Sequence, residues 1–394
     1  MSLQTKVIGI GAAGNKAAIQ LLKDEVMDKN NILLLNSTLK DIPQEYKELG
    51  VEFGNVKGAG KERELAKSMM VDSMQGENIN MIDNFINPTD KMVIIATSSE
   101  GGTGSGASII VAKYIKEVLE MNVHLFVFTG FEDDARGLKN TVDWFNDLSE
   151  DYTVEAISNQ NFLSESKTRE EAEISANKEF SKRVSILVGN YIVPSTNNID
   201  DTDLYKTVTT TGYMTVEHHE IEKLKSTDEF NDLLENMVDN SKSIDTEVGN
   251  IRMAVICNVT PKNRTFIDEN FTILKEKYGQ PFELFTHFQN TDSDEFIHAI
   301  VSGMKLPIDT IKKTYDSYIK QMKEIDFKKD KFFASKDKFD TSVGNELDFG
   351  KKARGSIVDD ENRLKKSKAN FFSSFNTSKE KKTNTFTNIT KNEL

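Results

Sequence analysis

The stretch SSEGGTGSGAS, residues 98–108, places four glycines within six positions. It follows the apolar run KMVIIAT (91–97) and precedes the helical pattern IIVAKYIKEVLEM (109–121). Glycine costs conformational entropy, and an ordinary turn from a strand into a helix needs only one or two. The glycine density therefore indicates a backbone that lies against a ligand, and the N–H groups at the start of a helix favour an anion. The sequence predicts a phosphate-binding loop at residues 101–106, with a purely structural glycine turn as the alternative.

Strand-like apolar segments alternate with helix-like segments through the first 150 residues. The strand-like segments are KVIGIG (6–11), NILLLNS (31–37), KMVIIATSS (91–99) and VHLFVFTG (123–130). This alternation is typical of a parallel sheet that is covered by helices on both faces and binds ligands beyond the carboxyl ends of its strands. We therefore expect an α/β fold with a Rossmann-like parallel-sheet domain.

The first loop, GIGAAGN (9–15), matches the G-x-G-x-x-G fingerprint of dinucleotide-binding proteins. That fingerprint also requires an acidic residue about 20 positions later to hold the ribose hydroxyls. Here the second strand ends in Asn36, Ser37 and Thr38, so an NAD-binding enzyme is disfavoured. A mononucleotide with several phosphates would use both glycine loops.

The composition narrows the class of protein further. The chain of 394 residues has 37% apolar and 29% charged residues, which is the balance of a globular protein without a membrane span. A single Cys257 excludes an intramolecular disulfide, and its place in the apolar run MAVICNV favours a buried side chain over a nucleophile. Five scattered histidines show no metal-ligand spacing, so we expect no zinc site. We predict a cytoplasmic protein with no membrane partner.

The residues quoted above resemble the tubulin and FtsZ superfamily of GTPases. GGTGSG is similar to the glycine-rich phosphate loop of that superfamily, and VIGIGAAGN (7–15) is similar to its first phosphate loop. Further similar segments follow in the family's order: LLNST with Asn36, VKGAGK (56–61), FTGFEDDAR (128–136), ISNQNFL (157–163) and ISANKEF (174–180). FTGFEDDAR resembles the family's ribose loop, which implies that Glu132 and Arg136 lie near the ribose. Asn159 and Asn177, which in isolation would be read as turn or cap residues, fall where the family contacts the guanine base.

The resemblance implies a nucleotide site that binds GTP or GDP together with Mg²⁺. The residues that would contact the nucleotide are Gly11, Ala12, Ala13, Asn15, Asn36, Gly58, Ala59, Gly60, Gly101, Gly102, Thr103, Gly104, Ser105, Gly106, Glu132, Arg136, Asn159 and Asn177. Two positions depart from the family pattern. Glu100 stands where a small residue often precedes the glycines, and Glu173 stands where an aromatic residue often stacks on the base.

The segment TNNIDDTDL (196–204) resembles the loop that completes the active site of the next subunit in tubulin-like filaments. The resemblance implies catalytic roles for Asn198, Asp200 and Asp203, with the two carboxylates orienting the water that attacks the γ-phosphate. The same cluster also fits a helix N-cap, which is the role that we expect for Asp201.

We divide the chain into four parts. These are a GTP-binding domain (1–175), a connecting central helix (176–197) with an apolar stripe over 176–194, a smaller α/β second domain that begins with the catalytic loop (198–319), and a last part (320–394). The last part contains the end of a long amphipathic helix predicted for 309–327, followed by a basic, flexible tail. From Lys320 onward the chain has 18 Lys and Arg against 12 Asp and Glu, which is a net charge of +6. Residues 1–319 therefore carry a net charge of −19. Within the superfamily this basic tail is most similar to TubZ, the plasmid- and phage-borne branch.

We therefore predict a self-assembling GTPase that forms head-to-tail filaments for plasmid or phage DNA segregation. In this interpretation the tail binds a centromere-binding DNA adaptor protein through Phe371, Phe372 and Phe375, and contacts DNA only indirectly. A tail that only keeps the filaments soluble is the competing interpretation. For the whole chain, the competing functions are an FtsZ-like cell-division filament, a nucleotide-binding scaffold without hydrolysis, and an NAD-binding Rossmann enzyme.

Overall fold

The computed structural model of the chain describes residues 3–55, 57–75, 79–149, 151–193, 199–290 and 294–333. The chain divides into two compact units, Met1–Asp316 and Ser317–Leu394. The sheet and the glycine loops all belong to the first unit. The predicted flexible tail from residue 334 onward lies outside the described residues.

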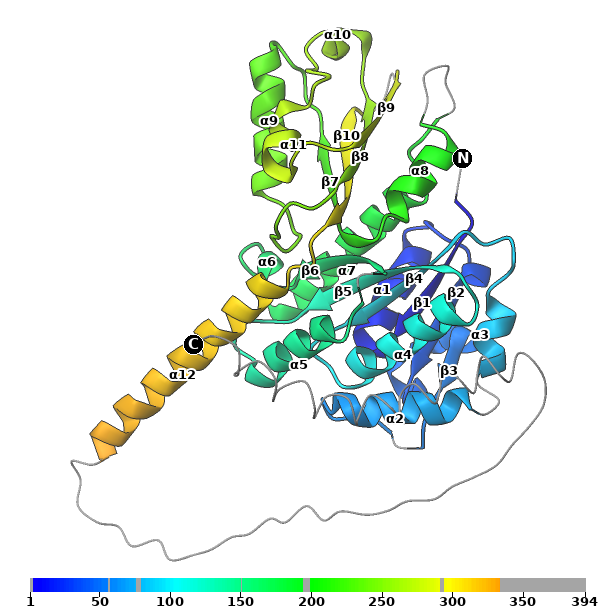
Figure 1. Cartoon of the computed structure of the whole chain (residues 1–394), viewed down its shortest axis with the longest axis vertical. Helices are drawn as coiled ribbons and strands as arrows, with labels where there is room; N and C mark the ends of the chain where they lie inside the picture. Colours follow the sequence, from blue (N-terminus) through cyan, green and yellow to red (C-terminus); the bar gives the residue numbers. More distant parts are fainter. Residues whose placement is uncertain are drawn as a thin grey trace, which may run out of the picture. The chain divides into compact units, whose positions relative to one another are not determined.

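One mixed sheet, ten-stranded among the described residues, runs through the first unit (Figure 1). In spatial order its strands are β3 (Gly50–Glu52), β2 (Ile32–Asn36), β1 (Thr5–Ile10), β4 (Met92–Ser98), β5 (Asn122–Thr129), β6 (Thr153–Ser158), β7 (Gly212–Glu220), β10 (Phe296–Met304), β8 (Arg252–Asn258) and β9 (Glu283–Gln289). The strands from β3 to β6 pair in parallel. The alternating pattern predicted this for β1, β2, β4 and β5, and it did not indicate β3 or β6. The strand order reverses between β1 and β4, and ligands of such sheets bind at this switch point.

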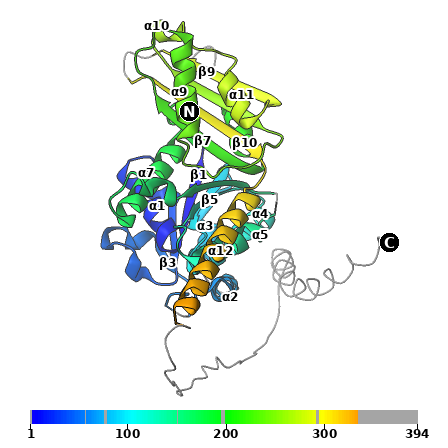
Figure 2. The ribbon, with the colours of Figure 1, turned by 90° about the vertical axis from the view of Figure 1, so that its left-hand side faces the viewer.

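The helices of the first half cover both faces of the parallel strands. Figure 2 shows α1 (Gly11–Lys23) and α7 (Arg169–Leu187) on one side, with α4 (Thr103–Glu117) and α5 (Ala135–Asn146) on the other. α2 (Arg63–Met74) packs against α4. Shorter elements complete this half: α3 (Ile79–Phe85), α6 (Gln160–Leu163) and 3₁₀ turns at Lys29–Asn31, Leu39–Asp41 and Gln44–Leu49.

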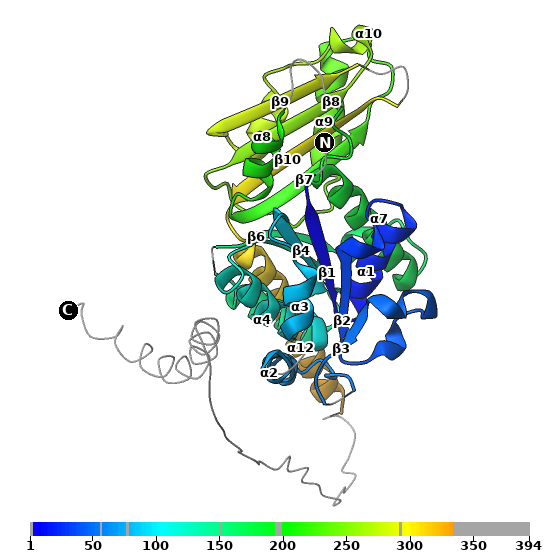
Figure 3. The ribbon, with the colours of Figure 1, turned by 90° about the vertical axis from the view of Figure 1, so that its right-hand side faces the viewer.

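The second half is built on the antiparallel pairs of β10 with β7 and β8, and Figure 3 shows these strands side by side. α9 (Thr227–Asp239) packs against β7 and α11 (Thr272–Tyr278), whereas α8 (Asp201–Val208) packs against β8 and β10. A single helical turn, α10 (Pro261–Arg264), follows β8. The sequence pattern did not indicate β7 or β10, because charged and histidine side chains interrupt their apolar residues.

Two helices differ from their predicted ranges. α7 starts after Thr168, whose hydroxyl caps the helix by accepting a hydrogen bond from the Glu171 N–H, and it ends at Leu187. It is therefore longer at its start and shorter at its end than the segment 176–194 that the apolar stripe indicated. α12 (Ile308–Phe333) continues six residues beyond Phe327, into the range that was predicted to be flexible.

The helical segment VDWFNDL (142–148) predicts that Trp144 is a core anchor, and the predicted core roles of Trp144 and Cys257 are both confirmed. Trp144 is fully buried on α5, and its indole N–H donates to the Ser108 hydroxyl at 3.0 Å. Cys257 is fully buried on β8, and burial raises the pKa of its thiol. A thiol with a raised pKa is a poor nucleophile, so Cys257 acts as a small apolar side chain.

Candidate functional site

Three of the four glycines of the 101–106 loop are required for close packing. A Cβ on Gly104 would lie 2.7 Å from Thr97 Oγ1 and 2.9 Å from the carbonyl oxygen of Ile10. A Cβ on Gly102 would lie 2.9 Å from the backbone nitrogens of Lys61 and Glu62, and one on Gly106 would overlap the backbone of α2. The loop is therefore the point where the first loop, the third loop and α2 meet.

Gly101 is different, because a Cβ added there would meet nothing within 4 Å. At Gly101, unlike at the other three glycines of this loop, the space into which a side chain would point is open. α4 begins at Thr103, so N–H groups of its first turn are free of helical partners and suited to an anion. This geometry fits the predicted phosphate loop, with the backbone as the binding group.

The first loop turns directly from β1 into α1 and packs against β4. Gly11 adopts φ of 76°, a left-handed conformation that favours glycine, and a Cβ on it would lie 2.8 Å from the Gly104 nitrogen. Gly14 lies against the carbonyl of Ala96 so closely that any side chain would overlap it. Ala12 and Ala13 occupy the first turn of α1 between these glycines. The two predicted phosphate loops are therefore adjacent in space.

Two buried asparagines on this edge of the sheet have side-chain oxygens without a partner. Asn15 on α1 is 2% exposed and Asn159 after β6 is 7% exposed. Within the described part of the chain, neither Oδ1 accepts a hydrogen bond. A buried polar atom without a partner costs free energy, so these oxygens indicate donors from a ligand. The amino and ring N–H groups of a guanine base are donors of this kind.

Asn36 and Asn177, the other predicted asparagines, lie in different environments. Asn36 ends β2, and its Oδ1 accepts from the Ser37 N–H at 2.9 Å. Ser37 in turn shares a hydrogen bond of 3.2 Å with Thr103 at the start of α4, which ties the second loop to the glycine loop. Asn177 is partly buried on α7.

One turn before Asn177, the non-aromatic Glu173 forms an ion pair of 3.3 Å with Lys16 on α1. The two side chains are 40% and 59% exposed, so this pair adds little stability. It spans the gap between α1 and α7 near the asparagines. At position 173, where the family often has an aromatic residue that stacks on the base, this chain therefore has a glutamate in a solvent-exposed ion pair.

The third loop and the loop after β5 are joined by two ion pairs. Lys61 pairs with Asp134, and Glu62 pairs with Arg136. Although burial opposes it, the hydrogen bond from Lys61 lowers the pKa of the Asp134 carboxyl. Gly58 and Gly60, which flank Ala59 in the third loop, both have positive φ and open surroundings.

Asn140 on α5 fixes the backbone of the same region. Its side-chain amide donates to the carbonyls of Lys61 at 3.1 Å and Glu100 at 2.9 Å, and contacts that of Gly101 at 3.3 Å. Arg63 plays a similar part on α2, since it donates to the Ser105 hydroxyl at 2.7 Å and pairs with Asp147 at 2.8 Å. Sequence reasoning did not identify Asn140 or Arg63, because nothing local marks their partners.

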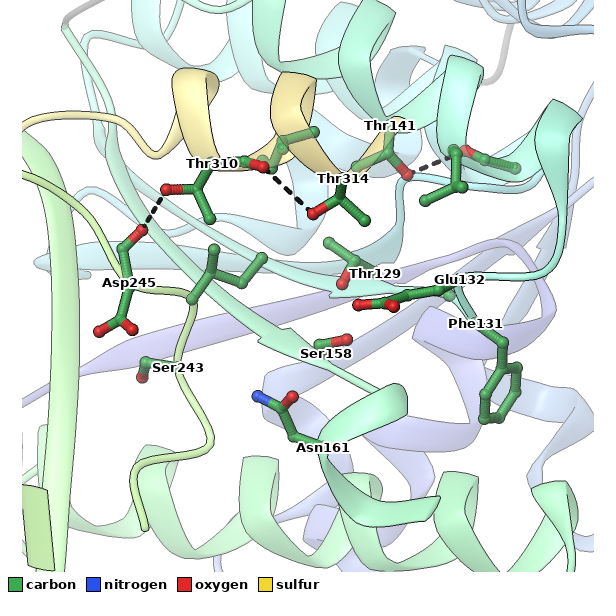
Figure 4. Close-up of a pocket in the computed structure, with 15 residues that line it drawn as sticks. Thr129, Phe131, Glu132, Thr141, Ser158, Asn161, Ser243, Asp245, Thr310 and Thr314 are labelled. Carbon is green, nitrogen blue, oxygen red and sulfur yellow. Dashed lines mark hydrogen bonds between the residues drawn. The ribbon is translucent and has the colours of Figure 1, made fainter. Parts of the chain in front are cut away.

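Glu132, predicted to contact the ribose, points into a cavity of about 200 Å³ (Figure 4). Thr129, Ser158 and Asn161 line the cavity at the ends of β5 and β6, and Thr310 and Thr314 line it from the start of α12. Neither Asn159 nor Asn177 lines it. The structure therefore brings Glu132 to this cavity, while Arg136 is engaged by Glu62.

The predicted catalytic carboxylates lie around the start of α8, and Asn198 falls outside the described residues. Asp200 is the N-cap of α8, and its carboxylate accepts from the Asp203 N–H at 2.8 Å. The cap is thus Asp200, not Asp201, which is exposed in the first turn. Asp203 is partly exposed and its nearest cation is Lys206 at 3.9 Å. α8 packs on β8 and β10, whereas α4, which begins in the glycine loop, packs on β1, β4 and β5. Within a single chain, the carboxylates of α8 and the glycine loop therefore belong to different parts of the sheet.

A buried ionic network links α7 to both halves of the sheet. Arg183 on α7 is 1% exposed and pairs with Glu155 of β6 at 2.6 Å and with Glu179 at 2.5 Å. Complete burial raises the pKa of Glu155 to about 7 despite the neighbouring Arg183. Its second oxygen lies 3.6 Å from Nε2 of the buried His124. The connecting helix is thereby held by charge as well as by apolar packing.

Two kinds of feature are absent from the described ranges. No group of three or more His, Cys, Asp or Glu side chains within them is arranged to hold a metal ion. No helix among these residues is both long and apolar enough to cross a bilayer.

The strand order, the glycine loops at the β1/β4 switch point and the helix that joins the two halves define a tubulin-like fold. No family model matches the chain. In sequence it is 24% identical over 195 residues to the tubulin-like protein CetZ2 of Haloferax volcanii, covering 47% of this chain and 54% of that protein. It is 26% identical over 212 residues to the cell division protein FtsZ of Aquifex aeolicus, covering 52% and 56%. The chain thus aligns with about half the length of these relatives.

The similarity to solved structures extends further along the chain. TubZ of Bacillus thuringiensis serovar israelensis, in a GTPγS-form protofilament, superposes with a TM-score of 0.65 at 17% identity. The superposition covers 84% of this chain and 93% of that one. The predicted α/β fold and the resemblance to the tubulin and FtsZ superfamily, with TubZ among its members, are confirmed.

Proposed function

We propose that this chain is a GTPase that assembles head to tail into filaments and hydrolyses GTP to GDP and phosphate between neighbouring subunits. The observation that carries the proposal is the cluster formed at one edge of the sheet by the two glycine loops and the unpartnered oxygens of Asn15 and Asn159. It offers backbone N–H groups for phosphate at one end and acceptors for a base at the other. The tubulin-like fold and the GTPγS-form TubZ protofilament support the same conclusion.

In this proposal the 101–106 loop, the 9–15 loop and the 58–60 loop bind the phosphates together with Mg²⁺. Asn15, Asn159 and Asn177 bind the guanine base, and the loop from Glu132 to Arg136 lies toward the ribose. Mg²⁺ is normally held by phosphate oxygens and water with only one or two protein ligands, so the absence of a carboxylate cluster in the described ranges is compatible with it.

The carboxylates of α8 would act on the GTP of the next subunit. Asp200 is engaged in capping α8, so its role is to hold the loop, whereas Asp203 has an accessible carboxylate. A carboxylate that accepts a proton from water, or orients it, assists attack on the γ-phosphate. Because α8 and α4 pack on different strands, an isolated subunit would bind GTP without completing the active site.

The test is GTP turnover as a function of protein concentration, with pelleting of filaments in parallel. Turnover per chain is expected to rise with concentration in the wild-type protein. Asp203→Asn is expected to pellet with GTP yet to lose about 100-fold in turnover, the usual scale for a group that acts on the attacking water. Asp201→Asn, one residue from the cap and exposed, is the matched control and should turn over GTP like the wild type. Turnover per chain that is independent of concentration would contradict the proposal.

We further propose that the filaments serve DNA segregation in the cytoplasm, as in the TubZ branch, through a centromere-binding adaptor that meets the basic tail. The +6 charge from Lys320 onward is the feature that favours it over an FtsZ-like or CetZ-like role. A scaffold without hydrolysis would show assembly with no turnover, and an NAD enzyme would bind NAD in preference to GTP. Binding of GTP, ATP and NAD by the same preparation, together with turnover, separates these functions.

A further inference from the structure

The connection between α7 and α8 carries the predicted catalytic loop, TNNIDDTDL (196–204). α7 ends at Leu187, and the structure describes residues 188–193 and then resumes at Ile199. Ile199 is buried, and Asp200 beside it caps α8. The far end of the connection is therefore fixed by burial and by the cap.

Gln289, the last residue of β9, holds the near end of this connection through its side-chain amide. Its Nε2 donates to the Tyr191 carbonyl at 3.0 Å, and its Oε1 accepts from the Val193 N–H at 2.9 Å. Nε2 of His287 lies 2.9 Å from the same oxygen, which can only accept, so this ring nitrogen carries the proton. A reversed amide would set its NH₂ group against two donors. The contacts therefore fix the orientation of the amide and the position of the backbone that it holds.

These hydrogen bonds hold a stretch of backbone that packing alone would leave loose. Gln289 is 8% exposed and His287 is fully buried, so water competes little for the amide. The Val193 side chain, by contrast, is 60% exposed, so apolar packing does not hold this residue. A carboxamide combines a donor and an acceptor in one planar group, which is what a carbonyl and a nearby N–H require of a single side chain.

Tyr191 anchors the residues just before Val193. Its ring packs edge-on against the rings of Phe296 and His298 of β10, with centroid separations of 5.4 and 4.7 Å. Lys182 of α7 lies over the same ring, 4.3 Å from its centroid, and donates to the Tyr191 hydroxyl at 2.9 Å. The chain that leaves α7 is thus fixed against α7, β9 and β10 as far as Val193.

Resting on the proposed function, we infer that Gln289 is a positioning residue for GTP hydrolysis on the neighbouring subunit. Its amide sets where the chain enters the catalytic loop, and thereby how the loop presents Asn198 and Asp203 to the GTP of that subunit. Displacing a positioning element by about 1 Å can cost on the order of 100-fold in rate. The nucleotide bound by the same chain lies elsewhere, because β9 is the last strand of the sheet and the glycine loops follow β1 and β4 (Figure 3).

The experiment measures GTP turnover per pelleted chain at saturating GTP in Gln289→Met and Gln289→Glu, with GTP affinity measured separately by calorimetry. Methionine has a similar volume without the hydrogen bonds. Glutamate keeps the acceptor for Val193 but sets an oxygen against the Tyr191 carbonyl. Dividing by the pelleted chains removes any defect in assembly. Both variants are expected to bind GTP within about twofold of the wild type and to lose about 10- to 100-fold in turnover per pelleted chain.

Mixed filaments test whether the defect lies in the loop that a chain offers to its neighbour. In filaments assembled from equal amounts of wild type and Gln289→Met, half of the interfaces contain the displaced loop. Turnover per chain is therefore expected to be about half that of the wild type. The double variant Gln289→Met with Asp203→Asn is expected to lose no more than Asp203→Asn alone, because both changes act on the same step.

Asn258→Val is the matched control for the loss of a buried amide. Asn258 lies on β8 in register with Gln289, is also buried, and donates to the carbonyl of Asp294 at 2.8 Å. The variant removes an amide from the adjacent strand and keeps Gln289. It is expected to retain the wild-type turnover per pelleted chain. Thermal unfolding of each variant compares the losses of stability.

Wild-type turnover per pelleted chain in both Gln289 variants would overturn the inference. So would an equal loss in Asn258→Val, additive losses in the double variant, or Gln289 variants that enter no filaments even with the wild type. Each of these results assigns Gln289 to stability or assembly and not to the loop. A wild-type protein whose turnover does not rise with concentration contradicts the proposed function instead, whatever the Gln289 variants do.

Discussion

At the residue scale, the glycines of the 101–106 loop have separable roles. Gly101 faces open space, whereas Gly104 packs against Thr97 and the Ile10 carbonyl. Gly101→Val should therefore fold normally and bind GTP at least about 10-fold more weakly, since the side chain would enter the phosphate region. Gly104→Val should lower the free energy of unfolding by roughly 1–3 kcal/mol or more, because overpacking forces backbone shifts. Calorimetric GTP titration and urea unfolding of both variants test this pair, and equal stability of the two would contradict it.

The same contacts correct the simplest view of the loop. Its glycine density predicted a backbone lying against phosphate, but packing against the first loop, the third loop and α2 already accounts for Gly102, Gly104 and Gly106. The two explanations are compatible, because the close packing positions the free N–H groups of α4. A sequence motif cannot separate them, since both require the same residue type.

At the element scale, the ionic network that joins Arg183 of α7 to Glu155 of β6 predicts that the free energy of unfolding depends on pH. Glu155 faces Arg183, Glu179 and Glu217 in addition to His124, and its pKa is raised to about 7 in the folded chain from an ordinary 4.5. Between these values the folded protein holds a proton that the unfolded chain has released. Raising the pH from about 5 to about 7.5 should therefore destabilise the fold, and the effect should level off above that range.

Glu155→Gln removes this titration while keeping an oxygen for Arg183 and adding an N–H for His124. Relative to this variant, the wild-type free energy of unfolding should fall with rising pH by an amount on the order of 1–3 kcal/mol. Urea unfolding of both proteins at pH 5, 6, 7 and 8 measures the difference. The lowered pKa of His124, about 3, is common to both proteins and largely cancels in the comparison. Parallel pH profiles would show that Glu155 does not titrate in this range.

At the scale of the whole molecule, the division between the body and the basic tail predicts separable activities. α12 runs to Phe333, so a truncation after Phe333 respects the helix, whereas one after Phe327 would cut it. The truncated chain is expected to turn over GTP and pellet within about twofold of the full chain. It should no longer carry into the pellet the DNA complex of the centromere-binding adaptor that we propose as its partner. Truncated filaments that still carry this DNA would exclude the tail as the link.

The sequence alone predicted the parallel arrangement of β1, β2, β4 and β5 and the location of the candidate nucleotide site, because both predictions depend on local patterns. Apolar runs that end in glycine or asparagine mark the strands and the loops at their carboxyl ends, and the order of these loops along the chain identified the tubulin-like architecture. The core roles of Trp144 and Cys257 were predictable for the same reason.

Only the tertiary structure decided which side chains face the site and which hold it together. It directs Glu132 toward a cavity, leaves the Oδ1 atoms of Asn15 and Asn159 without partners among the described residues, and revealed strands β7 and β10. Asn140 contacts a carbonyl 79 positions away, and Arg183 pairs with a carboxylate 28 positions away. Such contacts form between residues that no local pattern relates, because burial and charge pairing are set by the packing of whole elements.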